Sequence, residues 1–258
     1  MSRTALTERQ IHTPIRLACA MAGILLWQAA QAHSPVPFDA VYEVLVDGKP
    51  RLEARITLVR EGDAWKLSST SNGTRGLARL LRVSSEEHSS GRLRDGRLEP
   101  QEFRHHTKVV GRDDRWSARF DWTERMVTTH TEDGDFELPL EEDTMDPLSV
   151  TLALGRHLSS GAPEFTIGVL DEDEIDEHLY RASPPGPLQT ELGCLEVIAL
   201  ERVRENTERY STGWYANELD HVPVRARHGK RGDREFDMRI LRLELDGQAV
   251  AAREDCPD

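Results

Sequence analysis

Turn-forming residues recur along the chain at short intervals, and this spacing constrains the fold more than any other feature. Asp47-Gly48, Asn72-Gly73, Asp95-Gly96 and Asp133-Gly134 separate stretches in which apolar and polar residues alternate. Alternation with period two is typical of strands that bury one face. We predict one antiparallel meander, with a loop at the proline-rich residues 183–187 and strands at about 36–46, 51–60, 64–71, 83–93, 98–109, 115–122, 126–131, 136–138, 164–170, 174–182, 189–203, 209–215, 222–228 and 235–245.

Residues 146–161 are the main exception to this β pattern. Asp146 is a good N-cap, Pro147 fits the first helical position, and Gly161 can end a helix. Leu148, Leu152 and the following leucines cover most of the circumference, which favours a helix enclosed on several sides. We therefore expect a mainly β fold, with the strands organised around this apolar helix.

A second, short helix is predicted just after the third strand. Leu77, Leu80 and Leu81 recur at helical spacing, with arginines near the opposite side. The segment is either a lid over a binding site or a simple connection between strands.

The N-terminus reads as a cleavable signal peptide covering residues 1–32. Basic residues precede an apolar run from Leu17 to Trp27, and Ala30-Gln31-Ala32 forms a small-residue cleavage site. The run is shorter than the roughly 20 residues that cross a bilayer, so no integral membrane segment is expected after cleavage. Cys19 precedes most of the apolar run, which disfavours a lipoprotein. We expect a periplasmic protein of a Gram-negative bacterium, with residues 33–258 as one domain ending in a short flexible tail.

The charge balance excludes some classes of partner. The chain has 33 basic and 46 acidic residues and a net charge of −13, which becomes about −15 once residues 1–32 are removed. The sequence has no basic patch of the kind that nucleic-acid-binding proteins use, and a net negative charge repels anionic membrane surfaces. No nucleic-acid partner is expected.

Two cysteines, Cys194 and Cys256, remain after processing in an oxidising compartment. A disulfide between them would tie the C-terminal tail to the barrel wall, but Cys194 could equally be a small buried apolar residue. Neither has a neighbouring histidine in sequence, so a catalytic thiol is disfavoured.

Aromatic residues gather on one face of the strand predicted at 115–122. Trp116, Phe120 and Trp122 share that face, while arginines and Asp121 share the other. The three rings either pack in the core or line a ligand cavity. Trp214 and Tyr215 point to opposite faces, so one is core and the other lies near the rim; for Trp214, packing is favoured over a ligand role.

Motifs of catalysis and metal binding are missing from the sequence. The ten histidines lack ligand spacing, and the acidic run 171–177 lacks the central glycine of a calcium loop. There is no nucleophile elbow, phosphate-binding glycine loop or dinucleotide fingerprint. We predict no catalytic residues, no metal and no cofactor.

Several landmarks, taken in order, resemble a bacterial periplasmic family called domain of unknown function 3108. The resemblance spans about Phe38 to Gly247 and includes Tyr42 in the opening hairpin, Gly76-Leu77-Ala78-Arg79-Leu80-Leu81, Gly96-Arg97-Leu98-Glu99-Pro100 with Phe103, Arg119-Phe120-Asp121, Asp146-Pro147-Leu148-Ser149, and Trp214-Tyr215-Ala216 with Pro223-Val224-Arg225. The family in turn is similar to the outer-membrane lipoprotein carriers. That similarity implies a strongly curved antiparallel sheet, forming an unclosed barrel around a helix and exposing an apolar concavity.

These observations favour a non-enzymatic binding or carrier protein with an apolar groove. Its ligand would be a lipid, an acyl chain or an apolar segment of another envelope protein. The central helix or Leu77, Leu80 and Leu81 would form its lid, and the expected groove or core residues are Trp116, Phe120, Trp122, Leu148, Leu152 and Trp214. A structural or interaction module of the cell envelope, with a fully packed core, is the alternative. A hydrolase using a carboxylate pair ranks last.

Overall fold

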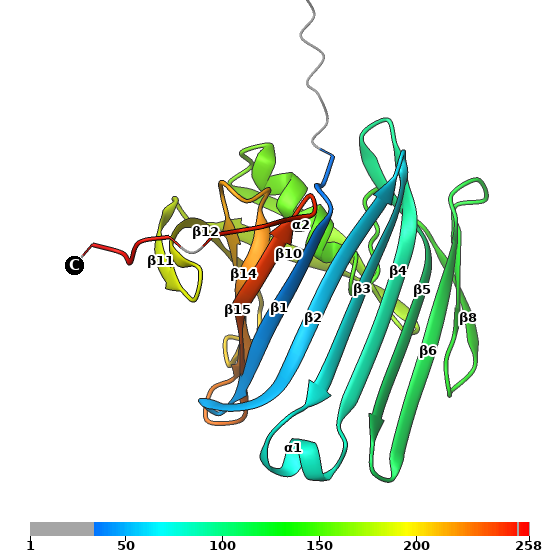
Figure 1. Ribbon diagram of the computed structural model, residues 1–258. Coiled ribbons are helices and arrows are strands. Elements are labelled where there is room, and N and C mark those ends of the chain that lie inside the picture. Colours follow the sequence, from blue (N-terminus) through cyan, green and yellow to red (C-terminus); the bar gives the residue numbers. More distant parts are fainter. Residues whose placement is uncertain (1–33, 252, 258) are drawn as a thin grey trace, which may run out of the picture. The chain divides into compact units, whose positions relative to one another are not determined.

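One antiparallel sheet dominates the computed structural model (Figure 1), which describes residues 34–251 and 253–257. The predicted signal segment, 1–32, lies outside the described residues. The strands are β1 (Phe38–Val46), β2 (Lys49–Glu61), β3 (Ala64–Gly73), β4 (Ser84–Arg94), β5 (Arg97–Val109), β6 (Arg112–Asp121), β7 (Met126–His130), β8 (Asp135–Pro139), β9 (Glu164–Asp171), β10 (Glu174–Ala182), β11 (Gly186–Thr190), β12 (Gly193–Val203), β13 (Arg209–Ala216), β14 (Val222–Lys230), β15 (Glu235–Leu245) and β16 (Gln248–Ala249); the helices are α1 (Gly76–Leu80) and α2 (Val150–Ser159).

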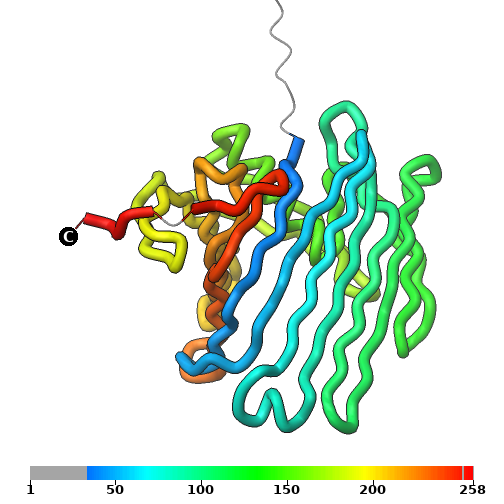
Figure 2. The backbone as a smooth tube through the Cα atoms, in the orientation of Figure 1, coloured from blue at the N-terminus to red at the C-terminus, as the bar shows by residue number. Residues whose placement is uncertain are grey.

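The sheet is not closed into a barrel. Its order is β8-β7-β6-β5-β4-β3-β2-β1-β15-β14-β13-β12-β10-β9, with β11 added beside β12 and β16 beside β15. Strands β1 to β8 follow one another as a meander (Figure 2), and the pairing of β1 with β15 joins the two ends of the chain. The predicted mainly β, unclosed antiparallel sheet is confirmed.

The strand predicted at 189–203 is wrong, because the structure splits it into the hairpin β11–β12. Gly193 adopts a positive φ of 85°, which turns the chain back on itself. Gly186 then pairs with Val197, so part of the predicted 183–187 loop is strand. Pro187 is tolerated there because β11 pairs only with β12 and leaves its other edge free.

Helix α2 begins later than predicted. The Asp146 carboxylate accepts hydrogen bonds from the backbone N–H groups of Leu148 (2.9 Å) and Ser149 (2.8 Å), so residues 146–149 form a turn that leads into the helix. Gly161, with φ of 74°, follows its C-terminal end as expected. Half of the ten helical residues are buried, namely Leu152, Ala153, Leu154, Gly155 and Leu158. The structure therefore does not show a helix surrounded along its whole length. Among the described residues, neither helix has the length and hydropathy needed to span a bilayer.

The core is one continuous cluster on the concave face of the sheet. Tyr42 is fully buried, and its hydroxyl donates a hydrogen bond of 2.8 Å to the carbonyl of Pro223. Trp65 packs against Gly91, where an added Cβ would lie 2.4 Å from the ring. Only glycine fits opposite this buried indole.

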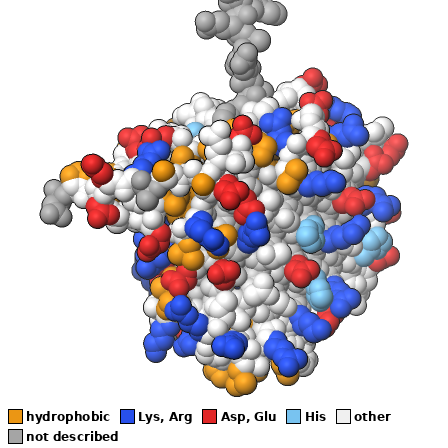
Figure 3. Space-filling model, viewed as in Figure 1, with side chains coloured by type: hydrophobic (Ala, Val, Ile, Leu, Met, Phe, Trp, Pro, Cys, Tyr) orange, Lys and Arg blue, Asp and Glu red, His pale blue; other side chains and the backbone are white. Residues whose placement is uncertain are grey.

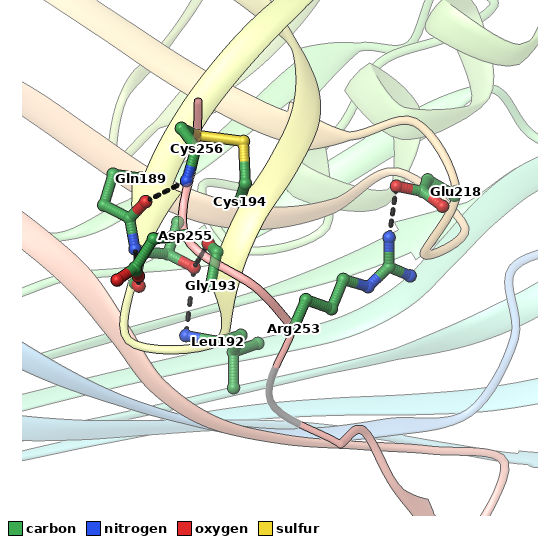
Figure 4. Close-up of a disulfide and its surroundings, with 9 residues drawn as sticks. Gln189, Leu192, Gly193, Cys194, Glu218, Arg253, Asp255 and Cys256 are labelled. Atoms are coloured by element: carbon green, nitrogen blue, oxygen red, sulfur yellow. Dashed lines mark hydrogen bonds and ion pairs between the residues drawn. A yellow bond between two sulfur atoms is a disulfide. The ribbon is translucent and has the colours of Figure 1, made fainter. Parts of the chain in front are cut away.

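The C-terminal tail is held against the β11–β12 hairpin (Figure 4), in contrast to the expected flexible tail. Cys194 and Cys256 form a disulfide. The backbone N–H of Cys194 donates to the carbonyl of Glu254 (2.8 Å), and that of Arg253 donates to the carbonyl of Leu192 (2.9 Å). The tail is thus bound to this hairpin by a disulfide and by backbone hydrogen bonds.

Replacing both cysteines (Cys194→Ser with Cys256→Ser) should lower the free energy of unfolding by about 4 kcal/mol, because the bridge closes a loop of 62 residues and restricts the unfolded chain. Urea unfolding monitored by circular dichroism measures this. Adding a reductant should destabilise the wild-type protein by a similar amount and leave the double variant unchanged. Equal stability of the oxidised wild type and the variant would contradict the prediction.

Candidate functional site

The residues predicted to line a groove lie mostly in the packed core. Trp116, Phe120, Leu148 and Leu152 are all buried. Trp122 is partly buried, and its indole N–H donates to the carbonyl of Pro100 at 2.6 Å. The six predicted residues therefore do not form one open groove in this structure.

Trp214 lies apart from these residues and is only partly buried. The guanidinium carbon of Arg225 lies 5.1 Å from the centre of its ring, as in a cation–π contact. Its neighbour Tyr215 is buried, and burial raises the pKa of its hydroxyl far above the ordinary value. Of this adjacent pair, Tyr215 is the core residue.

The leucines of the predicted lid are exposed. α1 has no buried residue, and Leu77 and Leu80 are among the most exposed apolar side chains that the structure describes. They cover no cavity in this conformation.

The concave face is polar toward the α1 end. Directly paired residues on neighbouring strands project to the same face. The pairing therefore places one row of side chains on the same side as buried Tyr42: Ala54, Ser71, Ser85, Thr107 and Asp114. β3 ends at Gly73 and β4 begins at Ser84, so the polar part of this row borders α1.

These polar side chains form a connected network on β4 and β5. The hydroxyls of Ser85 and Thr107 are 2.9 Å apart, and Thr107 Oγ1 lies 3.0 Å from His105 Nε2. His105 Nδ1 lies 3.0 Å from Glu87 Oε1, and this hydrogen bond raises the pKa of His105. This wall of the concavity is hydrophilic.

The opposite wall carries a cavity of about 400 Å³ lined by arginines. Its apolar part comes from Pro147, Val150, Val169 and Leu170, beside the start of α2. Arg202, Arg204 and Arg209 supply its charge, with His178 and Tyr180 between the two parts. We call this the arginine cavity.

The arginine cavity opens at the same end of the sheet as α1. Arg202 and Arg204 lie where β12 ends, and Arg209 begins β13. The strand pairing shows that these residues lie at the same end of the sheet as α1. Arg209 pairs with Lys230 at the end of β14, and Phe236 at the start of β15 pairs with Val46 at the end of β1. Val46 is followed by β2, whose Leu52 pairs with Gly73.

The arginines of this cavity have few protein partners. Among the residues that the structure describes, none of the three has a carboxylate within 4.0 Å, although Asp171 and Asp176 lie on the exposed rim. Arg204 Nη2 is 3.5 Å from Ser211 Oγ, and its buried Nε has no partner. Burial, followed by mutual repulsion, lowers the pKa of Arg202. Partly desolvated positive charges of this kind favour an anionic ligand.

His178 is uncharged at neutral pH. Its side chain is 12% exposed, and burial, followed by the charge of Arg202, lowers its pKa to about 4. Its Nδ1 lies 3.4 Å from the hydroxyl of Tyr180. The histidine thus adds a neutral polar surface between the arginines and the apolar residues.

The arginine cavity is absent from the sequence-based predictions because the alternation of β12 changes phase. Leu195 and Val197 are buried, but the next buried residue is Leu200. Between them, Ser183 Oγ accepts a hydrogen bond from the N–H of Ala199. A strict period of two from Leu195 would turn Arg202 outward, whereas its pairing with buried Tyr180 turns it inward.

Comparison with known families identifies the family of this chain. Residues 38–237 match the family described as "Protein of unknown function (DUF3108)". The match covers most of the chain, which therefore belongs to this family, as the sequence landmarks indicated. No curated protein matches the chain.

A solved structure with a TM-score above 0.5 is similar to this chain at the level of the fold. A beta-barrel-like protein of domain of unknown function DUF1849 from Brucella abortus matches with a TM-score of 0.52 and 9% identity, over 81% of this chain and 98% of the other. The hypothetical protein CT021 from Chlamydia trachomatis matches with a TM-score of 0.33 and 9% identity, over 87% and 93%.

The low pKa of His178 predicts a pH-dependent stability. The unfolded chain takes up a proton near pH 6.5, whereas the folded protein does so only near pH 4, so stability should fall as the pH is lowered through this window. Urea unfolding of wild type and His178→Gln should give a shallower pH dependence for the variant. NMR titration of the His178 imidazole provides a direct check: a pKa near 6.5 would contradict the prediction.

Proposed function

We propose that this protein is a non-enzymatic binding or carrier protein of the periplasm, and that it binds amphiphiles with an anionic head group and an apolar chain. One observation carries the proposal: three arginines, none with a carboxylate within 4.0 Å among the described residues, lie beside apolar residues in a cavity of about 400 Å³. The periplasmic location is supported by the predicted signal peptide and the absence of an enzymatic role by the lack of catalytic motifs.

The arginines suit a carboxylate or phosphate head group. A guanidinium binds such oxygens through paired, charge-assisted hydrogen bonds. Arg202 lies on β12 and Arg204 directly follows its last residue, Val203, and both side chains line the cavity. Arg202, Arg204 and Arg209 line one cavity, and none of them forms an ion pair with another described residue.

The apolar chain of the ligand would lie along Pro147, Val150 and Val169, where α2 meets β9. Beyond these residues the core is packed, so a long chain needs a further space. A second cavity, of about 440 Å³, lies near the open end strands β8 and β9 and includes Leu138 and Ile175. Gly168 and Glu177 of this second cavity face the opposite side of the β9–β10 hairpin from Val169 and His178, so a long chain would have to pass around the open edge of the sheet to reach it.

The packed core also favours a second candidate function. Because Trp116, Phe120, Leu148 and Leu152 are buried, the protein could serve as an interaction module of the envelope, binding a partner through an open sheet edge. This candidate predicts no affinity for a small amphiphile.

Isothermal titration calorimetry with dodecyl phosphate tests the proposed function. The wild-type protein should bind one molecule, and dodecanol should bind more weakly because it lacks the charge. The Arg202→Gln, Arg204→Gln double variant should lose at least roughly tenfold in affinity, since each charge-assisted hydrogen bond contributes about 1.5–3 kcal/mol.

The matched control is Arg119→Gln, which removes an exposed arginine from β6. It should bind dodecyl phosphate as the wild type does. Absence of binding by the wild type, or equal affinity in the double variant, would contradict the proposal and favour the interaction module.

A further inference from the structure

Exposed apolar side chains gather at one end of the molecule. The described residues include five large hydrophobic side chains with high exposure, and four of them lie together: Leu77 (70%), Leu80 (72%), Leu81 (39%) and Val110 (65%). The N–H of Val110 donates to the carbonyl of Leu81 at 3.1 Å, which joins α1 to the β5–β6 turn. We call these four residues the α1 tip.

Backbone hydrogen bonds hold the α1 tip in this exposed state. The N–H of Thr74 donates to the carbonyl of Arg51 (2.9 Å), and that of Val83 donates to the carbonyl of Ala78 (2.9 Å). At Gly73 an added Cβ would lie 2.3 Å from the Ala78 oxygen, so the close approach requires glycine. The leucines therefore project outward from a turn that is held by backbone hydrogen bonds. An exposed apolar cluster of this kind marks an interaction surface for a protein or a membrane.

The α1 segment of the tip carries positive charge. Residues 73–85 contain three arginines and no acidic residue, within a chain of net charge −13. Arg79 and Arg82 form no ion pair with any residue in the described part of the chain. Figure 3 shows hydrophobic side chains at the lower edge, where α1 lies in Figure 1, with basic side chains beside them.

We propose that the α1 tip docks onto an anionic lipid bilayer, with its leucines in the head-group region and its arginines on the lipid phosphates. The tip is a projecting turn, which suits insertion into a bilayer surface, and its charge is complementary to anionic lipid. The overall negative charge predicts repulsion from such a surface, but residues 73–85, which carry the tip's leucines, are locally basic. Repulsion elsewhere would orient the protein, so that only the α1 end approaches the membrane.

This orientation brings the concave face to the membrane. The polar row of β3 to β5 and the arginine cavity both lie at the α1 end. Docking through the tip would therefore present the opening of the concavity to the bilayer surface. The inference itself stands on the α1 tip alone and does not depend on a ligand in the arginine cavity.

Co-sedimentation with vesicles of phosphatidylcholine, with and without phosphatidylglycerol, tests the docking. The wild-type protein should bind the anionic vesicles and lose affinity as salt is added. Leu77→Ser with Leu80→Ser should weaken binding on the order of tenfold or more, because the leucines no longer leave water on docking. Arg79→Gln and Arg82→Gln should each weaken it about fivefold at low salt.

Matched controls separate docking from general effects. Val59→Ser removes an exposed apolar side chain from β2, and Arg119→Gln removes an exposed charge from β6; both should bind vesicles as the wild type does. The Arg202→Gln, Arg204→Gln variant should also bind normally, which distinguishes docking from ligand binding. Thermal unfolding should be the same for all variants of the tip.

Two results would overturn the inference. One is the absence of wild-type binding to anionic vesicles, in which case the tip is covered by a protein partner or a second copy of the chain. The other is vesicle binding that is unaffected by the leucine substitutions, which would reduce the interaction to adsorption by charge.

Discussion

The buried carboxylate of Asp146 joins parts of the fold that do not pair with each other. It accepts hydrogen bonds from the turn into α2 and, at 2.5 Å, from Ser89 Oγ on β4. The preceding residue, Met145, exchanges backbone hydrogen bonds with Gly168 and Leu170 of β9. β4 and β9 are thus linked through one short segment. Burial raises the pKa of Asp146 and opposes its charged form, and the surrounding donors offset that cost.

This link explains why an unclosed sheet can keep a defined concave face. The connection from β8 to α2 crosses between the end strands and carries α2 to one end of the sheet. Large apolar side chains fill that end, whereas serine, histidine and arginine side chains line the end beside α1. The protein therefore has one packed end and one hydrophilic end, and both the arginine cavity and the α1 tip belong to the second.

Much of the architecture could be predicted from the sequence, since alternation and turn residues determine most strands. Trp116 and Phe120 share a face as their spacing requires. Three features could not be predicted, because each depends on tertiary contacts. α2 starts late because Asp146 is bonded within the fold, and the β11–β12 turn depends on the left-handed conformation of Gly193. The buried face of β12 switches between Val197 and Leu200 while its pairing with β13 stays in register, so Arg202 faces inward opposite Tyr180, and no periodicity in the sequence reveals this.

The central claim is that the concave face carries an anionic amphiphile. The most direct test is to identify the molecule that remains bound when the protein is purified. Mass spectrometry of an organic extract, from protein purified from its native host without detergent, makes this measurement. The account predicts one anionic amphiphile per chain in the wild type and a much smaller amount in the Arg202→Gln, Arg204→Gln variant. An extract without any amphiphile, or equal amounts from both proteins, would contradict it.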